Sequence, residues 1–132
     1  EAIKQNNDLN KVNGMILCYP VISSGQFAHR GSFNAIGATN EVLLNKTSLE
    51  LQVDENTPPA FIWHTFEDTC VPVENSMLLA LAMRKNNIPF ELHIYPAGEH
   101  GLSLASDVTG IVSTHVQSSM SLAKEWLNSI IE

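Results

Sequence analysis

Three short apolar segments, set off by proline or glycine, constrain this chain more than any other feature of its sequence. They cover residues 14–19, 60–64 and 90–95. The first two are continuously apolar and the third is somewhat more polar. Continuous apolar runs of this length are typical of strands that are buried on both faces of a sheet. We therefore expect three strands at these positions.

Helical patterns follow the second and third of these segments. Residues 74–86 are rich in Leu, Ala and Met and come shortly after Pro72, and residues 111–131 carry apolar side chains at spacings of three and four. Strand, helix, strand, helix with short connections predicts an α/β fold, with a parallel sheet covered by helices on both faces. Residues 21–56 read as a long polar excursion over the sheet, with one helix signal of capping-box form at 47–50.

The composition is that of one ordinary globular domain, or part of one, and it argues against two classes of partner. Against 14 acidic side chains there are 7 basic ones, a net charge of −7 over 132 residues, so we expect neither nucleic acid nor a membrane surface as a partner. No apolar run approaches the length of about 20 residues that a spanning helix needs, and the polar first 13 residues resemble no targeting peptide. Cys18 and Cys70 suffice for neither a disulfide framework nor a zinc site, so a reducing, cytoplasmic location is expected.

Two loops that follow neighbouring predicted strands hold the candidate catalytic residues. The loop H-T-F-E-D-T-C-V-P (64–72) contains Asp68, and the loop P-A-G-E-H-G (96–101) contains His100. Parallel strands place both loops at the same edge of the sheet, where ligands bind in open α/β folds. A carboxylate there can accept the Nδ1 proton of a histidine, fix its tautomer and stabilise the imidazolium. The sequence therefore predicts that Asp68 and His100 act as a pair.

Four short segments, placed in this order at strand ends, resemble the C-terminal half of the α/β-hydrolase fold. They are Y-P-V-I (19–22), P-P-A-F (58–61), H-x-x-x-D-x-x-V-P (64–72) and G-x-H-G (98–101). Within that fold they are most similar to small esterases, which include acetyl xylan esterases and the esterase/lipase relatives of dienelactone hydrolase. The resemblance implies that Asp68 is the acid and His100 the base of a catalytic triad. It also implies a small ester substrate, such as an acetylated carbohydrate, and no metal or organic cofactor.

The nucleophile of that fold has no counterpart in the sequence. Its serine stands on a G-x-S-x-G elbow, upstream of the acid and after an HGGG-type oxyanion loop, and neither motif occurs here. Ser23, Ser24 and Ser32 lack the glycine pattern of an elbow. The resemblance places the elbow on a strand that pairs with Met15–Tyr19. We therefore expect half of an enzyme, inactive alone, which pairs through this strand with a missing N-terminal half or with a second copy of itself.

Other residues in and near the two loops have more ordinary interpretations. Glu67 would be the acid if the register were shifted by one, but Asp68 fits the spacing of four residues from His64. His64 either borders the site or is a buried strand-end histidine bonded to the backbone. Cys70 lies in the acid loop rather than at an elbow, beside a carboxylate whose charge disfavours a thiolate. Residues 27–33 resemble the insert that lines the pocket of similar esterases, but by themselves are a polar loop with two aromatic side chains.

The remaining histidines show no pattern of partners. His29, His93 and His115 would make a metal site only by guesswork, and Cys18 is most simply part of the core. Two further functions stay open. One is a non-catalytic α/β module that binds a partner, and the other is a peptidase, because the prolyl-peptidase relatives of this fold share the same C-terminal motifs.

Overall fold

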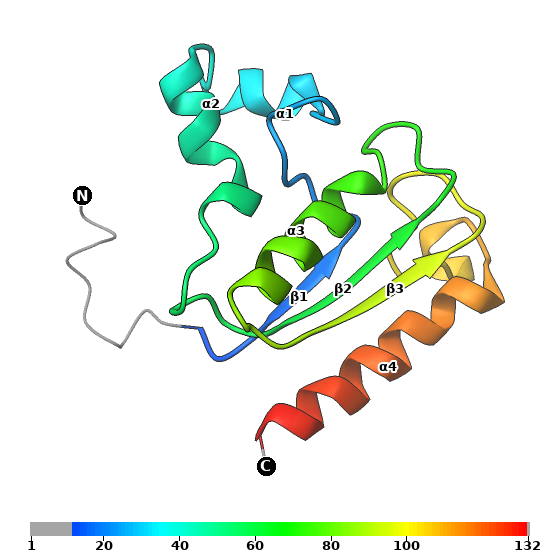
Figure 1. Cartoon of the computed structure of the whole chain (residues 1–132). Helices are drawn as coiled ribbons and strands as arrows, with labels where there is room; N and C mark the ends of the chain where they lie inside the picture. Colours follow the sequence, from blue (N-terminus) through cyan, green and yellow to red (C-terminus); the bar gives the residue numbers. More distant parts are fainter. Residues whose placement is uncertain (1–11, 132) are drawn as a thin grey trace.

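The computed structural model describes residues 12–131 as a parallel sheet with a long helix packed against each face (Figure 1). The elements are β1 (Met15–Cys18), α1 (Arg30–Ala35), α2 (Glu41–Thr47), the 3-10 turn η2 (Leu49–Leu51), β2 (Ala60–Thr65), α3 (Glu74–Lys85), β3 (Phe90–Tyr95), the 3-10 turn η3 (Asp107–Thr109) and α4 (Thr114–Ile131). Most of the polar N-terminal segment and Glu132 lie outside the described residues. No helix of the described part is both long and apolar enough to cross a membrane.

The three strands pair in the order β1-β2-β3, and both pairs are parallel. Met15 lies opposite Ala60, and Ala60 lies opposite Phe90, so the strands begin level with one another. Their carboxyl ends therefore meet at one edge of the sheet, as Figure 1 shows. The α/β class with three parallel strands flanked by helices is confirmed.

The central strand β2 is buried along its whole length because it has a strand on each side and a helix on each face. Successive side chains of a strand point to opposite faces. Phe61 and Trp63 pack in the cluster that includes α4, whereas Ala60 and Ile62 pack in the cluster that includes α3. By the same alternation His64 points to the α3 face, which decides its partners in the site.

Three elements are shorter than the sequence patterns suggest. β1 stops at Cys18 because Tyr19 has a φ of 40°, outside the range of an extended strand. The C-terminal helix begins at Thr114 rather than at residue 111, because residues 111–113 form an irregular connection in which the amide of Ser113 donates to the carbonyl of Ala105. The expected helix at 74–86 ends at Lys85, with Asn86 as its cap.

The excursion at 21–56 contains more helix than its sequence signals indicate. The capping-box pattern at 47–50 does not start an α-helix, because Thr47 is the last residue of α2 and only the short turn η2 follows it. Instead Asn40 caps α2, and its side-chain oxygen accepts from the amide of Leu43 at 3.0 Å. The helix signal at 47–50 therefore marks only the short turn η2, and the asparagine cap seven residues upstream, which begins α2, was missed.

Asn75 on α3 ties the excursion to the rest of the fold. Its Oδ1 accepts from the amides of Ile22 and Ser23 at 3.0 and 2.9 Å, and its Nδ2 donates to the carbonyl of Phe27 at 2.9 Å. The side chain is fully buried, so these bonds replace the hydrogen bonds to water that the amide gives up on burial. They hold the chain that leaves β1 beside the loop that leaves β2.

Candidate active site

Asp68 lies in the loop between β2 and α3, and its side chain is fully buried. Its Oδ1 accepts from the backbone amides of Cys70 and Val71 at 3.0 and 2.8 Å. Burial by itself raises the pKa of a carboxyl group, but the amide of Val71 and the neighbouring His100 outweigh it, so the pKa of Asp68 lies below its ordinary value. The loop therefore holds a buried carboxylate in its charged form, with Oδ2 left for other partners.

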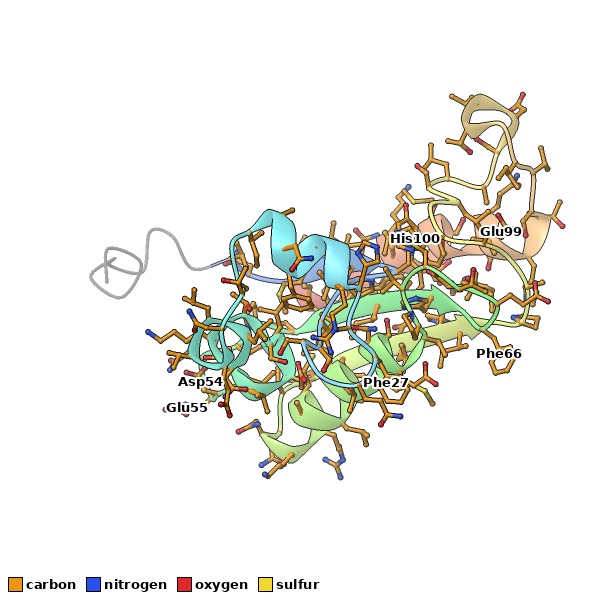
Figure 2. All side chains as sticks on the ribbon, turned by 90° about the horizontal axis from the view of Figure 1, so that it is seen from above. Phe27, Asp54, Glu55, Phe66, Glu99 and His100 are labelled. Carbon is orange, nitrogen blue, oxygen red and sulfur yellow. The ribbon has the colours of Figure 1, made fainter. Side chains whose placement is uncertain are left out.

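His100 lies in the loop after β3 and meets Asp68 directly. Its Nδ1 is 2.7 Å from Oδ2 of Asp68, and its side chain is 30% exposed. A carboxylate can only accept, so Nδ1 carries the proton and Nε2 of the neutral ring is free to take one. Figure 2 looks down on this part of the molecule and labels His100, with Phe66 on the neighbouring loop.

Gly98 lets the histidine loop turn back over the sheet. Its φ is 130°, which a side chain rarely adopts, and an added Cβ would come within 2.5 Å of Leu102 Cδ1. The carbonyl of Gly98 accepts from the hydroxyl of Thr65 at 2.7 Å, and its amide donates to Glu67 at 3.1 Å. Both partners belong to β2 or its loop, so the two loops are fastened together close to the Asp68–His100 pair.

A second histidine, His64, contacts the same carboxylate from the side of the sheet that α3 covers. His64 is fully buried at the end of β2, and its Nε2 lies 2.8 Å from the carbonyl of Val71 and 3.2 Å from Oδ2 of Asp68. Its Nδ1 lies 2.7 Å from the hydroxyl of Ser76 on α3. Burial lowers the pKa of His64, although the carbonyl of Val71 and the charge of Asp68 act in the opposite direction. His64 is thus a neutral ring bonded to the acid.

Tyr19 packs against the other side of His100. Its ring lies edge-on to that of His100, with centroids 4.8 Å apart, and edge-on to Trp63 at 4.9 Å. The φ of 40° at Tyr19 directs the chain away from β1 at this point, while its amide donates to the carbonyl of Trp63 at 2.7 Å. A strained residue in contact with a functional side chain is a common feature of active sites.

The other residues weighed from the sequence lie apart from the pair or have partners of their own. Glu67 is exposed and accepts from the amide of Gly98, so it does not contact His100 in place of Asp68. Cys70 is exposed, and its amide rather than its thiol bonds Asp68. Burial raises the pKa of the Cys18 thiol, which fits its interpretation as a core residue.

The serines of the excursion are placed for local structure. Ser23 and Ser24 are buried; the hydroxyl of Ser23 accepts from the amide of Gly25, and the amide of Ser24 donates to Ser48. Ser32 hydrogen-bonds to His29 at 2.9 Å. Within residues 12–131 no serine hydroxyl is hydrogen-bonded to His100.

The described residues form no cluster that could hold a metal. Over residues 12–131, no group of three His, Cys, Asp or Glu side chains is arranged to hold an ion. His93 instead bonds Glu91 at 2.7 Å, and His115 packs edge-on against Tyr95.

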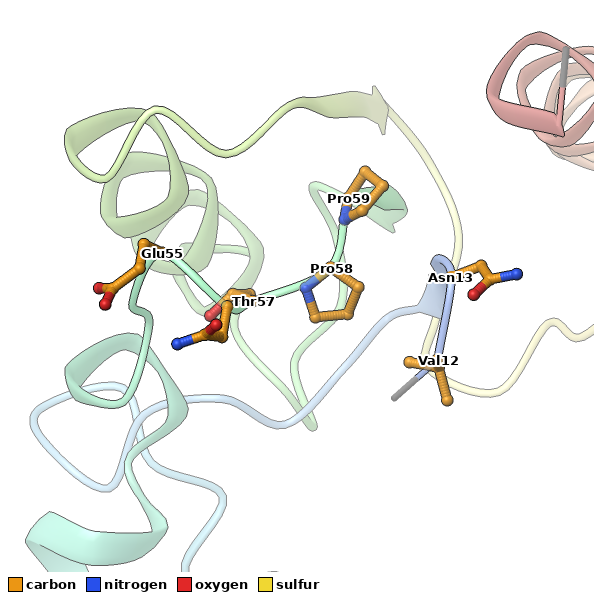
Figure 3. A pocket seen from close by; sticks show the side chains of 7 residues that line it. Val12, Asn13, Glu55, Thr57, Pro58 and Pro59 are labelled. Atoms are coloured by element: carbon orange, nitrogen blue, oxygen red, sulfur yellow. The ribbon is translucent and has the colours of Figure 1, made fainter. Parts of the chain in front are cut away.

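A hollow of about 500 Å³ lies at the opposite end of the sheet (Figure 3). It is lined by residues that precede β1 and β2, among them Asn13, Glu55 and Pro59. Asp68 and His100 follow the carboxyl ends of β2 and β3, so this hollow is remote from them. Ligands of open α/β sheets bind at the carboxyl edge, and we therefore assign the site to that edge.

Sequence reasoning missed the contribution of Ser76 and left the role of His64 undecided. Ser76 shares the buried face of α3 with Leu79, Ala80 and Met83. A buried hydroxyl on the core face of a helix needs a hydrogen-bond partner, so the position of Ser76 in the apolar pattern could have indicated that it bonds a polar side chain. The partner itself depended on the rotation of α3 over β2, which the residue pattern does not specify.

The parallel strands, with an acid after β2 and a histidine after β3, define the C-terminal part of an α/β hydrolase. Solved structures agree. An acetyl ester-xyloside bifunctional hydrolase from Caldicellulosiruptor lactoaceticus is 42% identical with a TM-score of 0.83, covering 95% of this chain and 48% of that one. A sugar hydrolase from Lactococcus lactis is 32% identical with a TM-score of 0.84, covering 96% and 52%. A carboxylesterase from Lactobacillus plantarum is 27% identical with a TM-score of 0.70, covering 89% and 44%.

Comparisons of the sequence assign the chain to one family within the α/β hydrolases. Residues 23–129 match the model of the prolyl oligopeptidase family, and the chain belongs to that family. Endo-1,4-beta-xylanase B of Butyrivibrio fibrisolvens is 46% identical over 114 residues, which are 81% of this chain and 18% of that protein. The chain thus spans about half the length of the solved structures it matches and less than a fifth of this curated relative.

Proposed function

We propose that this chain carries the acid and the base of a serine-type carboxylester hydrolase. One observation supports it above the others: the 2.7 Å hydrogen bond between His100 Nδ1 and Asp68 Oδ2, at the carboxyl edge of a parallel sheet. The buried, charged carboxylate fixes the tautomer in which Nε2 of His100 can accept a proton. The partial exposure of His100 leaves it accessible to a substrate.

In the proposed reaction His100 relays one proton in each of two half-reactions. Its Nε2 takes the proton of a serine hydroxyl as that serine attacks the ester carbonyl, and gives it to the departing alcohol. It then takes a proton from water, which hydrolyses the acyl-enzyme, and returns it to the serine. The negative charge of Asp68, 2.7 Å from Nδ1, stabilises the imidazolium that forms in each half of the reaction.

The serine and the oxyanion loop are proposed to come from a segment that docks along β1. In the described residues β1 has a strand neighbour on one side only, and Ile16 in its middle is 46% exposed. Unpaired amides and carbonyls at such an edge favour pairing with another strand. We expect this partner to be an N-terminal hydrolase half, and pairing with a second copy of the chain to occur only when that half is absent.

The names of two relatives favour an acylated sugar as the substrate. One is an acetyl ester-xyloside bifunctional hydrolase and the other a xylanase, at 42% and 46% identity. We therefore propose a short acyl ester of a xylose-containing carbohydrate, with acetyl as the first acyl group to test.

The test joins this chain to the N-terminal half of the Caldicellulosiruptor lactoaceticus hydrolase (the fusion enzyme). Acetylated xylo-oligosaccharide, 4-nitrophenyl acetate and a prolyl peptide 4-nitroanilide are compared as substrates. We expect hydrolysis of both esters, with the peptide slower by orders of magnitude. Preference for the peptide would make the protein a peptidase, and a folded fusion enzyme that cleaves none of the three would favour a non-catalytic binding module.

A further inference from the structure

A buried chain of hydrogen bonds reaches the acid from the side away from His100. It runs from Ser76 on α3 through His64 at the end of β2 to Asp68, over distances of 2.7 and 3.2 Å. All three side chains are fully buried. The proposed proton transfers between serine, ester and His100 make no use of His64 or Ser76.

The contacts of His64 determine its tautomer. Nε2 lies 2.8 Å from the carbonyl of Val71, and a carbonyl can only accept, so Nε2 carries the proton. That proton also faces Oδ2 of Asp68 at 3.2 Å. In the neutral ring Nδ1 is then an acceptor, and the hydroxyl of Ser76 donates to it at 2.7 Å. Ser76 and Val71 together fix both the ring orientation and the position of the donor.

When His64 is neutral, the negative charge of Asp68 can stabilise the imidazolium of His100 without competition from a second positive ring. Burial lowers the pKa of His64, and a positive charge on His100 lowers it further. A charged ring at this position would compete with the His100 imidazolium for one carboxylate and repel it across Asp68. A neutral N–H donor orients Oδ2 without that cost, much as hydrogen bonds behind a metal ligand orient the ligand.

We propose that His64, held by Ser76 and Val71, is a positioning residue that fixes Oδ2 of Asp68 against Nδ1 of His100. This inference rests on the proposed function of the Asp68–His100 pair and adds to it a residue that never touches the substrate. Oδ1 of Asp68 is fixed by two backbone amides, whereas within residues 12–131 the partners of Oδ2 are the two imidazoles. Without His64, His100 would be the one hydrogen-bond partner of Oδ2 among residues 12–131.

The first experiment needs no activity. The fusion enzyme is labelled with ¹⁵N-histidine, and long-range ¹H–¹⁵N spectra at neutral pH report the protonation of each ring nitrogen. The His64→Leu variant assigns the signals of His64. We expect the neutral form with the proton on Nε2, and a proton on Nδ1, or on both nitrogens, would overturn the proposal.

The second experiment separates positioning from folding in the fusion enzyme. His64→Leu fills a similar space without a donor, His64→Gln keeps an N–H near the position of Nε2, and His93→Gln is the matched control outside the network. We expect His64→Leu to lower kcat by about 10- to 100-fold with KM within a factor of about three, because a misplaced catalytic group costs turnover rather than binding. His64→Gln should recover most of the loss, and His93→Gln should lose nothing.

The outcomes keep the two proposals apart. A folded fusion enzyme without esterase activity would refute the proposed function and leave the ring spectra to decide the tautomer of His64. An active fusion enzyme in which His64→Leu keeps its kcat would refute the positioning role alone. Equal losses of kcat in the Leu and Gln variants would also refute it, because they would mean that the shape of the ring matters and its hydrogen bond does not.

Discussion

Replacing Asp68 with Asn exchanges one carboxylate oxygen for an amide nitrogen and reverses one side of the hydrogen bonding. The amide oxygen can still accept from the amides of Cys70 and Val71 at the Oδ1 position. The amide nitrogen then stands where Oδ2 accepted from His100 at 2.7 Å, so two N–H groups face each other. His100 must turn its unprotonated nitrogen toward residue 68, which puts the proton on Nε2 and removes the base.

The magnitude follows from that tautomer. Loss of the correct tautomer and of the charge beside the imidazolium costs about 10,000-fold in kcat in a comparable triad. We expect a loss of this order for Asp68→Asn in the fusion enzyme, measured as the turnover of 4-nitrophenyl acetate. The cost in stability should be only about 1–3 kcal/mol, because His64 keeps the carbonyl of Val71 as an acceptor.

Glu67 supplies the matched control, because it is an acidic neighbour one residue away. Glu67→Gln keeps an oxygen that can accept from the amide of Gly98, so kcat should change by less than about threefold. The reasoning is refuted if Asp68→Asn retains more than a tenth of the parental kcat while folded. It is equally refuted if Glu67→Gln costs as much as Asp68→Asn.

Two further results are expected from the folded chain. The free energy of unfolding should fall on acidification in two steps. Below pH 6.5 the unfolded chain takes up a proton on His64 more readily than the folded chain does, because folding lowers the pKa of His64. Below pH 3.8 the unfolded chain likewise protonates Asp68 more readily than the folded chain does. Urea unfolding on either side of each value checks this, and greater stability in acid would contradict it. In the fusion enzyme, Gly98→Ala should lower stability by about 1–3 kcal/mol and lower esterase activity as well, because its Cβ would press on Leu102 at a φ of 130°. Gly37→Ala, with a φ of 73° and open space around it, should cost stability but not activity.

The sequence predicted the fold best at the central strand, where burial on both faces of the sheet requires apolar side chains. β2 has no exposed residue, so its run from Ala60 to His64 could hardly be anything but apolar, and the sequence predicted it as a strand. Because parallel strands share a carboxyl edge, the loops that follow them could be placed side by side from the strand pattern alone. The structure brings Asp68 and His100 together at that edge, and their catalytic roles stay a prediction.

The rest depended on contacts that a linear pattern does not contain. α2 begins at an asparagine cap and buries none of its residues, so no periodic core-facing pattern marks it in the sequence. The partnership of His64 with Ser76 required the rotation of α3 over β2. The positive φ of Tyr19, which places its ring against His100, is a backbone state that nothing in the residues around it demands.

The most direct test of the proposed acid–base pair is the intact mass of the fusion enzyme and its His100→Ala variant after brief exposure to a fluorophosphonate. This reagent reacts readily only with a serine that a neighbouring base has activated. We expect one adduct on the parent enzyme and none on the variant, with both folded by circular dichroism. Equal labelling of the two proteins, or none on the folded parent, would show that His100 and Asp68 do not serve a serine nucleophile.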